Sequence, residues 1–108
     1  MGELESRDQV EAAQALGKLP YIDKDRIAIW GWSFGGYNTL MALSTGNGTF
    51  KVGIAVAPPT DWKYYDSVYT ERFMRTPQGN FEGYAATSPL RRVEKLARQV
   101  IAGSWNRR

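Results

Sequence analysis

Two glycines flank one serine at a spacing used in nucleophilic catalysis, in the segment Gly31-Trp32-Ser33-Phe34-Gly35. Glycines two positions to either side of a serine let a strand and a helix approach closely, so the serine can occupy a tight, strained turn. Its hydroxyl is then free to attack a carbonyl carbon, and the backbone N–H of the next residue can donate to the oxyanion that forms. We predict that Ser33 is a nucleophile and that the backbone N–H of Phe34 belongs to an oxyanion hole.

The serine motif indicates a nucleophile more strongly if it lies between a strand and a helix, so the segments on either side of it matter. Residues 26–31 form a short, nearly continuous apolar run, which is typical of a buried parallel strand. Residues 37–43 favour a helix, and residues 50–57 favour a second buried strand that two prolines close. A strand, a helix and a strand within about 30 residues predict a βαβ unit with a parallel sheet. A glycine-rich turn in which Ser33 only caps the helix is the simpler alternative.

Helices are expected on both sides of this unit, which makes the predicted class α/β. Residues 7–19 carry apolar side chains every three residues, as an amphipathic helix does. Ser88 stands before a proline, a pattern that predicts a helix N-cap. The apolar stripe of that last helix consists of Val93, Leu96 and Ala97. The stretch from Val100 is long enough only to begin another strand.

Aromatic residues are concentrated between residues 60 and 76, on what we expect to be an irregular segment leading into a short helix. The cluster consists of Trp62, Tyr64, Tyr65, Tyr69 and Phe73. Composition alone favours core packing over contact with a ligand, because most aromatic side chains in proteins serve the core.

Length and composition limit the function further. The chain has 108 residues, enough for one domain over residues 1–108, and 43% of them are hydrophobic, as in an ordinary globular protein. Its net charge of +3 is spread too evenly for a nucleic-acid-binding surface. The absence of cysteine excludes disulfides and thiolate metal sites, and no residue pattern requires a cofactor. No stretch approaches the ~20 apolar residues of a membrane span, and the acidic start does not resemble a signal peptide.

The chain contains no histidine. A serine nucleophile activated in the usual way needs an imidazole within hydrogen-bond reach. We therefore expect this sequence to be a fragment of a hydrolase that is inactive by itself.

Three stretches resemble one family of serine peptidases. Residues 26–37 closely resemble the prolyl oligopeptidase (S9) family, in particular its dipeptidyl peptidase IV branch, and residues 50–58 and 61–74 do so as well. The resemblance extends over about residues 8–97. Segments 38–41 and 75–77 are most similar to bacterial members.

The resemblance implies a truncated, partial α/β-hydrolase fold from a post-proline exopeptidase. Such an enzyme removes N-terminal dipeptides with Pro or Ala at the second position through an acyl-enzyme, here on Ser33. The residues that match the family's proline pocket are Trp62, Tyr65 and Tyr69, and Tyr65 would also help to hold the free amine of the substrate. The resemblance further implies a homodimeric parent enzyme that is periplasmic, secreted or membrane-anchored.

The sequence departs from the family pattern at two positions and lacks several catalytic groups. Phe34 stands where tyrosine is commoner, and Pro59 replaces a small aliphatic residue. The family's Asp and His lie downstream of the matched region, its oxyanion tyrosine upstream, and its amine-binding glutamates in a propeller domain. None of these groups is in this chain.

Two other functions remain open from the sequence. A fragment of another α/β-hydrolase, such as an esterase or acyl-peptide hydrolase, would share the serine motif but would not need the spacing of Trp62, Tyr65 and Tyr69. A non-catalytic remnant that acts at most as a binding module would agree with the absence of histidine.

Overall fold

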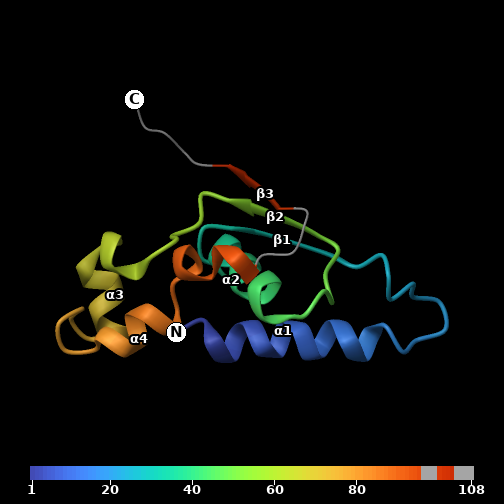
Figure 1. Ribbon diagram of the computed structural model, residues 1–108, viewed down its shortest axis with the longest axis horizontal. Coiled ribbons are helices and arrows are strands. Elements are labelled where there is room, and N and C mark those ends of the chain that lie inside the picture. Colours follow the sequence, from blue (N-terminus) through green and yellow to red (C-terminus); the bar gives the residue numbers. More distant parts are fainter. Residues whose placement is uncertain (96–99, 104–108) are drawn as a thin grey trace.

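The computed structural model describes residues 1–95 and 100–103, with residues 93–95 and 100–103 described by their backbone alone. Figure 1 shows the arrangement of the elements. In chain order they are α1 (Glu3–Leu16), β1 (Ala28–Trp32), α2 (Phe34–Thr45), β2 (Val52–Val56), the 3₁₀ helix η1 (Trp62–Tyr64), α3 (Ser67–Met74), α4 (Phe81–Ala86), the 3₁₀ helix η2 (Pro89–Lys95) and β3 (Val100–Gly103).

The centre of the molecule is a parallel sheet in the order β1-β2-β3. Ala28 pairs with Val52 and Trp32 with Val56, so β1 and β2 are aligned over their whole lengths. Helix α2 makes the crossover between these two strands. The predicted βαβ unit and α/β class are confirmed, and residues from Val100 do form a further strand, β3, beside β2.

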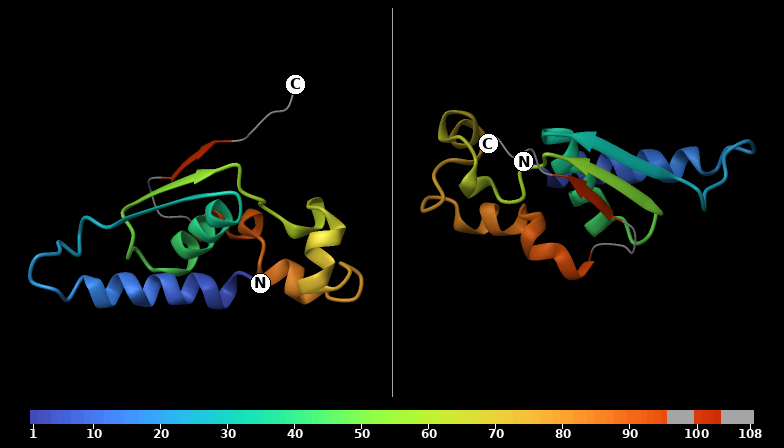
Figure 2. Two further views of the ribbon diagram at one scale, coloured as in Figure 1. Left: turned by 180° about the vertical axis from the view of Figure 1, so that it is seen from behind. Right: turned by 90° about the horizontal axis from the view of Figure 1, so that it is seen from above.

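Both long helices pack on one face of the sheet (Figure 1). The first core cluster joins α1, α2 and the residue before β2, and consists of Val10, Ala13, Ala42, Leu43 and Phe50. Ile27 and Ile29 pack against it from the sheet. The side chains that alternate with them point to the opposite face, where Trp30 is 71% and Trp32 58% exposed. No described element covers that face, as both views in Figure 2 show.

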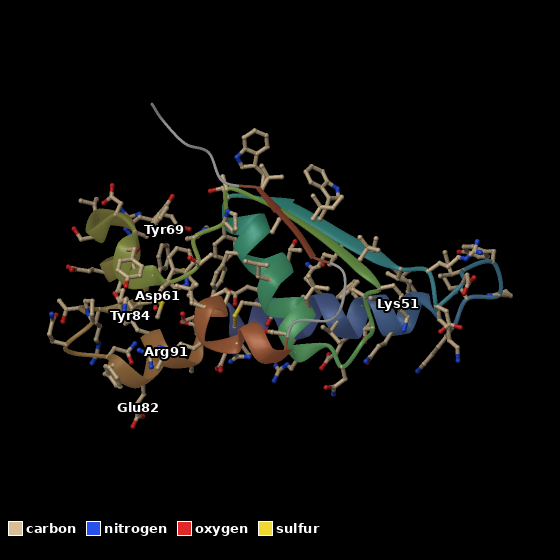
Figure 3. All side chains as sticks on the ribbon, turned by 45° about the horizontal axis from the view of Figure 1, so that its top comes forward. Lys51, Asp61, Tyr69, Glu82, Tyr84 and Arg91 are labelled. Carbon is tan, nitrogen blue, oxygen red and sulfur yellow. The ribbon has the colours of Figure 1, made fainter. Side chains whose placement is uncertain are left out.

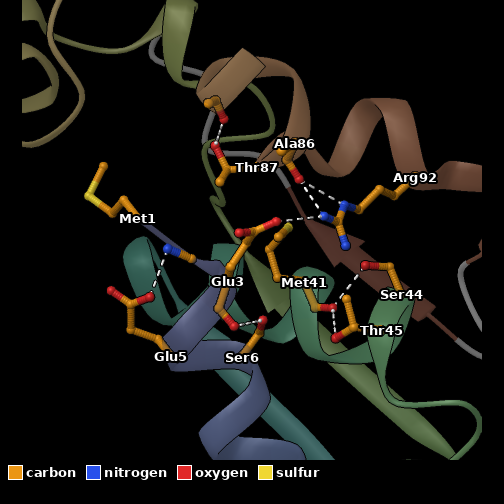
Figure 4. A network of polar contacts seen from close by, with 12 residues as sticks. Met1, Glu3, Glu5, Ser6, Met41, Ser44, Thr45, Ala86, Thr87 and Arg92 are labelled. Atoms are coloured by element: carbon orange, nitrogen blue, oxygen red, sulfur yellow. Dashed lines mark hydrogen bonds and ion pairs between the residues drawn. The ribbon is translucent and has the colours of Figure 1, made fainter. Parts of the chain in front are cut away.

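A second core cluster joins the first turns of α2 to the segments that follow β2. It consists of Tyr37, Met41, Trp62, Met74 and Tyr84. The start of α1 is fastened to the same region, because Arg92 of η2 donates to the carbonyl of Ala86 and lies 3.6 Å from the carboxylate of Glu3 (Figure 4). This cluster places α3 and α4 at one end of the sheet.

Three elements differ from the expectation. Helix α1 begins at Glu3, four residues earlier than the apolar pattern indicated, and the N–H of Gly2 before it donates to the carboxylate of Glu5 at 2.8 Å. Helix α4 was not predicted; it is only six residues long and is started by the side chain of Asn80, which accepts from the N–H of Gly83.

The segment after Ser88 is a 3₁₀ helix that starts at Pro89, as the sequence pattern indicated, and the carbonyl of Ser88 accepts from the N–H of Arg91 at 3.1 Å. The hydroxyl of Ser88 lies 3.0 Å from Oδ2 of Asp61. The predicted apolar stripe of Val93, Leu96 and Ala97 lies outside the described side chains. Within the described part of the chain, no helix is both long enough and apolar enough to cross a bilayer.

Candidate active site

Ser33 occupies the single residue between β1 and α2, with φ 52° and ψ −116°. Its N–H donates to the carbonyl of Val56 at 2.9 Å, and its carbonyl accepts from the N–H of Tyr37 at 3.0 Å. A positive φ in a residue with a side chain costs on the order of 1–3 kcal/mol and persists only where the surroundings impose it. The sharp, strained turn predicted at this serine is confirmed.

The hydroxyl of Ser33 does not serve the helix that it precedes. Ser33 holds the N-cap position of α2 but makes no side-chain cap hydrogen bond. The simpler alternative, a serine that only caps a helix, therefore lacks its defining contact. Ser33 is half-buried and stands at the N-terminal, positive end of the α2 dipole, where the first N–H groups of the helix have no carbonyl partner one turn earlier. The first of these N–H groups belongs to Phe34.

The tight approach of strand and helix depends on Gly31. A Cβ atom at this position would lie 2.2 Å from the backbone carbon and oxygen of Gly35, an impossible contact. A Cβ at Gly36 would lie 3.0 Å from the carbonyl oxygens of Gly31 and Val56. A Cβ at Gly35 would meet no described atom within 4 Å. The sequence argument was therefore right for Gly31 and wrong for Gly35, where the backbone rather than a missing side chain makes the contact.

Trp62, Tyr65 and Tyr69, the residues matched to a proline pocket, do come together, and we call them the aromatic wall. The ring centroids of Trp62 and Tyr65 are 5.5 Å apart, those of Trp62 and Tyr69 6.1 Å, and those of Tyr65 and Tyr69 5.5 Å. Trp62 is only 1% exposed, whereas Tyr65 is 42% and Tyr69 39% exposed. The wall thus has a buried base that belongs to the core and two rings that reach the surface.

Two aromatic side chains that the sequence argument did not use connect the serine turn to this wall. The ring of Phe34 lies 6.1 Å from that of Trp62, and the ring of Tyr37 lies 4.7 Å from it, edge-on. Phe34 and Tyr37 are three residues apart in the first turn of α2, the spacing at which helical side chains share a face. That spacing predicts that the two side chains share a helix face, but not that this face contacts Trp62. Burial raises the pKa of Tyr37 to about 12.

Pro59 lies beside the wall, at the edge of a shallow hollow of about 190 Å³. The hollow is also lined by Pro58, Thr60, Asp61, Tyr64 and Tyr65. Figure 3 shows Asp61, Tyr69 and Tyr84 at the same end of the molecule, with Lys51 at the other. The serine turn directly follows β1, and the segment that carries the hollow and the wall directly follows the parallel strand β2, so both begin at the carboxyl edge of the sheet.

A model of the prolyl oligopeptidase family, peptidase family S9, matches residues 1–104. The chain belongs to this family. A probable dipeptidyl-aminopeptidase B of Neurospora crassa is 58% identical over 101 residues, which are 93% of this chain and 11% of that protein. A probable dipeptidyl peptidase 4 of Neosartorya fischeri is 55% identical over 93 residues, which are 86% of this chain and 12% of the relative.

The same resemblance is found among solved structures. The crystal structure of Porphyromonas gingivalis dipeptidyl peptidase 4 matches 96% of this chain and 15% of its own, with a TM-score of 0.94 and 59% sequence identity. The resemblance to the dipeptidyl peptidase IV branch is thereby confirmed. The chain spans about a tenth of the length of the curated relatives that it matches.

Proposed function

We propose that this chain supplies the nucleophile segment of an α/β-hydrolase-type serine exopeptidase that releases N-terminal dipeptides after proline or alanine. The observation that carries the proposal is the strained turn at Ser33, between a parallel strand and a helix, with a hydroxyl that makes no cap hydrogen bond. Family membership supports the same chemistry, and the dipeptidyl peptidase names of the relatives support the exopeptidase activity.

The reaction follows from the position of the hydroxyl. Ser33 Oγ attacks the carbonyl carbon of the second residue of the substrate, and its proton passes to a general base. The backbone N–H of Phe34 donates to the oxyanion of the tetrahedral intermediate. The general base gives the proton taken from Ser33 to the amine nitrogen, which leaves as a neutral amine, and water then hydrolyses the acyl-enzyme on Ser33. Because the chain contains no histidine, an imidazole base has to come from outside these 108 residues.

The aromatic wall accounts for selectivity at the second substrate position. Rigid rings around a small apolar space fit a pyrrolidine ring or a methyl group and exclude long side chains. Trp62 forms the buried floor of the wall and is fixed in the core, and the half-exposed Tyr65 and Tyr69 face the substrate. Tyr65 additionally contributes to binding of the substrate's free amine.

A chimaera tests the proposal directly. Replacing the matching segment of the Porphyromonas gingivalis dipeptidyl peptidase 4 with this chain joins Ser33 to the remainder of a related protein. We expect release of chromophore from a Gly-Pro anilide, and loss of about 10⁴-fold or more in kcat for Ser33→Ala. Ser44→Ala is the matched control, because this buried serine of α2 only donates to the carbonyl of Met41. Turnover that survives Ser33→Ala would overturn the assignment of the nucleophile.

A non-catalytic role of the chain by itself is the second candidate, and the absence of histidine favours it. The two candidates are compatible, since one describes the assembled enzyme and the other describes the isolated 108 residues. Ser33-dependent turnover of a Gly-Pro anilide in the chimaera supports the first candidate, and its absence there leaves only the second.

A further inference from the structure

Thr87 and Ser88, between α4 and η2, connect the serine helix to the aromatic wall. Neither residue is aromatic or belongs to the serine motif. Both are buried, Thr87 with 4% of its surface exposed and Ser88 with none. Each makes a hydrogen bond in a different direction, one to α2 and one to the segment that starts the wall. We call these two residues the Thr87–Ser88 link.

The first contact of the link is with α2. The hydroxyl of Tyr37 donates to the carbonyl oxygen of Thr87 at 2.8 Å and also lies 3.1 Å from the carbonyl oxygen of Met1. Tyr37 is fully buried, four residues after Ser33, and the edge of its ring meets Trp62 at 4.7 Å. This hydrogen bond therefore fixes the link relative to the helix that begins at the serine turn.

The second contact of the link is with the base of the wall. The hydroxyl of Ser88 lies 3.0 Å from Asp61 Oδ2 and 3.2 Å from the carbonyl oxygen of Thr60. Asp61 is buried, and its other carboxylate oxygen accepts from the N–H of Lys63 at 3.1 Å, which caps η1. Because Trp62 is the first residue of η1, the carboxylate holds Trp62 and the link together.

Tyr37 and Trp62 are connected in two ways. Their rings are in direct contact, and the Thr87–Ser88 link also joins them, because Tyr37 donates to Thr87 and Ser88 donates to Asp61, the residue before Trp62. Weakening either hydrogen bond lets the wall move relative to Ser33 without altering the serine turn itself. A proline ring fills more of a small apolar pocket than a methyl group does, so a displaced wall loses more contact with proline than with alanine.

We propose that the Thr87–Ser88 link sets the position of the aromatic wall relative to Ser33, and thereby the preference for proline over alanine. Tyr37, Asp61 and Ser88 are positioning residues, because they act on the substrate only through Trp62 and its neighbours. This inference rests on the proposed function and adds to it the contacts that determine its selectivity.

The test compares two substrates and one substrate-independent label in the chimaera described above. Tyr37→Phe removes the contact with α2, and Ser88→Ala removes the contact with Asp61. For each variant, we expect kcat/KM for a Gly-Pro anilide, relative to a Gly-Ala anilide, to fall about three- to tenfold, mainly through KM. The rate at which a small fluorophosphonate labels Ser33 should stay within about twofold, since this reagent does not need the proline pocket.

Tyr84→Phe is the matched control. Tyr84 belongs to the same core cluster as Tyr37, and its hydroxyl donates to the carbonyl of Arg75 at 2.6 Å, but it makes no hydrogen bond to the link. The ratio between the two substrates should be unchanged in this variant. If Tyr37→Phe or Ser88→Ala does not fold, Asp61→Asn replaces it, because it preserves the shape and weakens the acceptor for Ser88.

The outcomes separate the two proposals. An unchanged substrate ratio in the variants of the link overturns the inference and leaves the proposed function intact. An equal change in Tyr84→Phe, or a parallel loss of labelling at Ser33, also overturns it, because general loosening or damage to the serine turn would then be the cause. Absence of Ser33-dependent turnover in the unsubstituted chimaera overturns both proposals.

Discussion

Tyr65 and Tyr69 touch each other, yet each keeps more than a third of its surface exposed. Side chains in that position add little to stability, because much of their surface stays in water when the chain folds. In the chimaera, Tyr65→Ala and Tyr69→Ala should lower kcat/KM for a Gly-Pro anilide by about 10- to 100-fold. The free energy of unfolding should fall by less than about 2 kcal/mol.

The neighbouring Tyr64 provides the comparison for these variants. It is more exposed than either, and its ring faces the ammonium group of Lys63 at 4.7 Å. Tyr64→Ala should change neither quantity appreciably. Wild-type kcat/KM in Tyr65→Ala or Tyr69→Ala would contradict the assignment of the wall.

Tyr37 makes the stability of the protein depend on alkaline pH. Burial raises its pKa from 10.0 to about 12, so the folded state keeps the phenol proton over a range in which the unfolded chain loses it. The contribution of this phenol to the free energy of unfolding is fully present below pH 10.0 and is lost progressively as the pH rises to about 12. At about 1.4 kcal/mol per pKa unit, the loss is roughly 3 kcal/mol.

Urea unfolding of the chain across this pH range measures the effect. The free energy of unfolding should fall less steeply with pH in Tyr37→Phe than in the unsubstituted chain, because the substitution removes the titrating group. Identical slopes in the two proteins would show that the phenol of Tyr37 is not protected by the fold.

At the scale of elements, the junction between β1 and α2 leaves no space for a side chain at Gly31 but leaves space for one at Gly35. Gly31→Ala places a Cβ 2.2 Å from the backbone of Gly35, so strand and helix have to separate. We expect a loss of more than about 3 kcal/mol in the free energy of unfolding, or no folding. Gly35→Ala meets no described atom within 4 Å and should change stability by no more than about 1 kcal/mol. Thermal or chemical denaturation of both variants distinguishes them, and equal losses would contradict the geometry.

The elements that were predictable from the sequence are those fixed by local patterns. Apolar runs indicated β1 and β2, and the glycine and serine spacing indicated the turn at Ser33. Helix α4 was not predicted because its six residues are too few to show an apolar repeat, and η2 was not predicted in its observed form because a contact distant in sequence lies at its start. The hydroxyl of Ser88, the residue before η2, lies 3.0 Å from Asp61, which is 27 residues earlier.

The candidate site also has residues that the sequence predicted and contacts that only the structure shows. Ser33 and the three wall residues were identified from a motif and a family resemblance. The contact between the first turn of α2 and Trp62 depends on how helix and loop pack, which no residue spacing along the chain encodes. The role of Tyr37 therefore became visible only in three dimensions.

At the scale of the whole molecule, the 108 residues hold a nucleophile without a base. A neutral serine hydroxyl is a poor nucleophile, and loss of a catalytic triad member costs on the order of 10⁴–10⁶ in kcat even where the rest of the site is intact. We expect the isolated chain to release no chromophore from a Gly-Pro anilide beyond a Ser33→Ala control. Ser33-dependent turnover in a preparation free of host peptidases would require another base, such as a lysine.

The two tryptophans on the open face of the sheet also give the protein an optical reporter. Indole emission moves to longer wavelength in water, and iodide quenches only the rings that it can reach. Trp30 and Trp32 are exposed to solvent, whereas Trp62, the buried member of the aromatic wall, is not. With Trp105, which lies outside the described residues, replaced by phenylalanine, the emission separates into a red, quenchable part and a blue, shielded part. Whatever covers the open face in a larger assembly would turn the first part blue and leave the second unchanged.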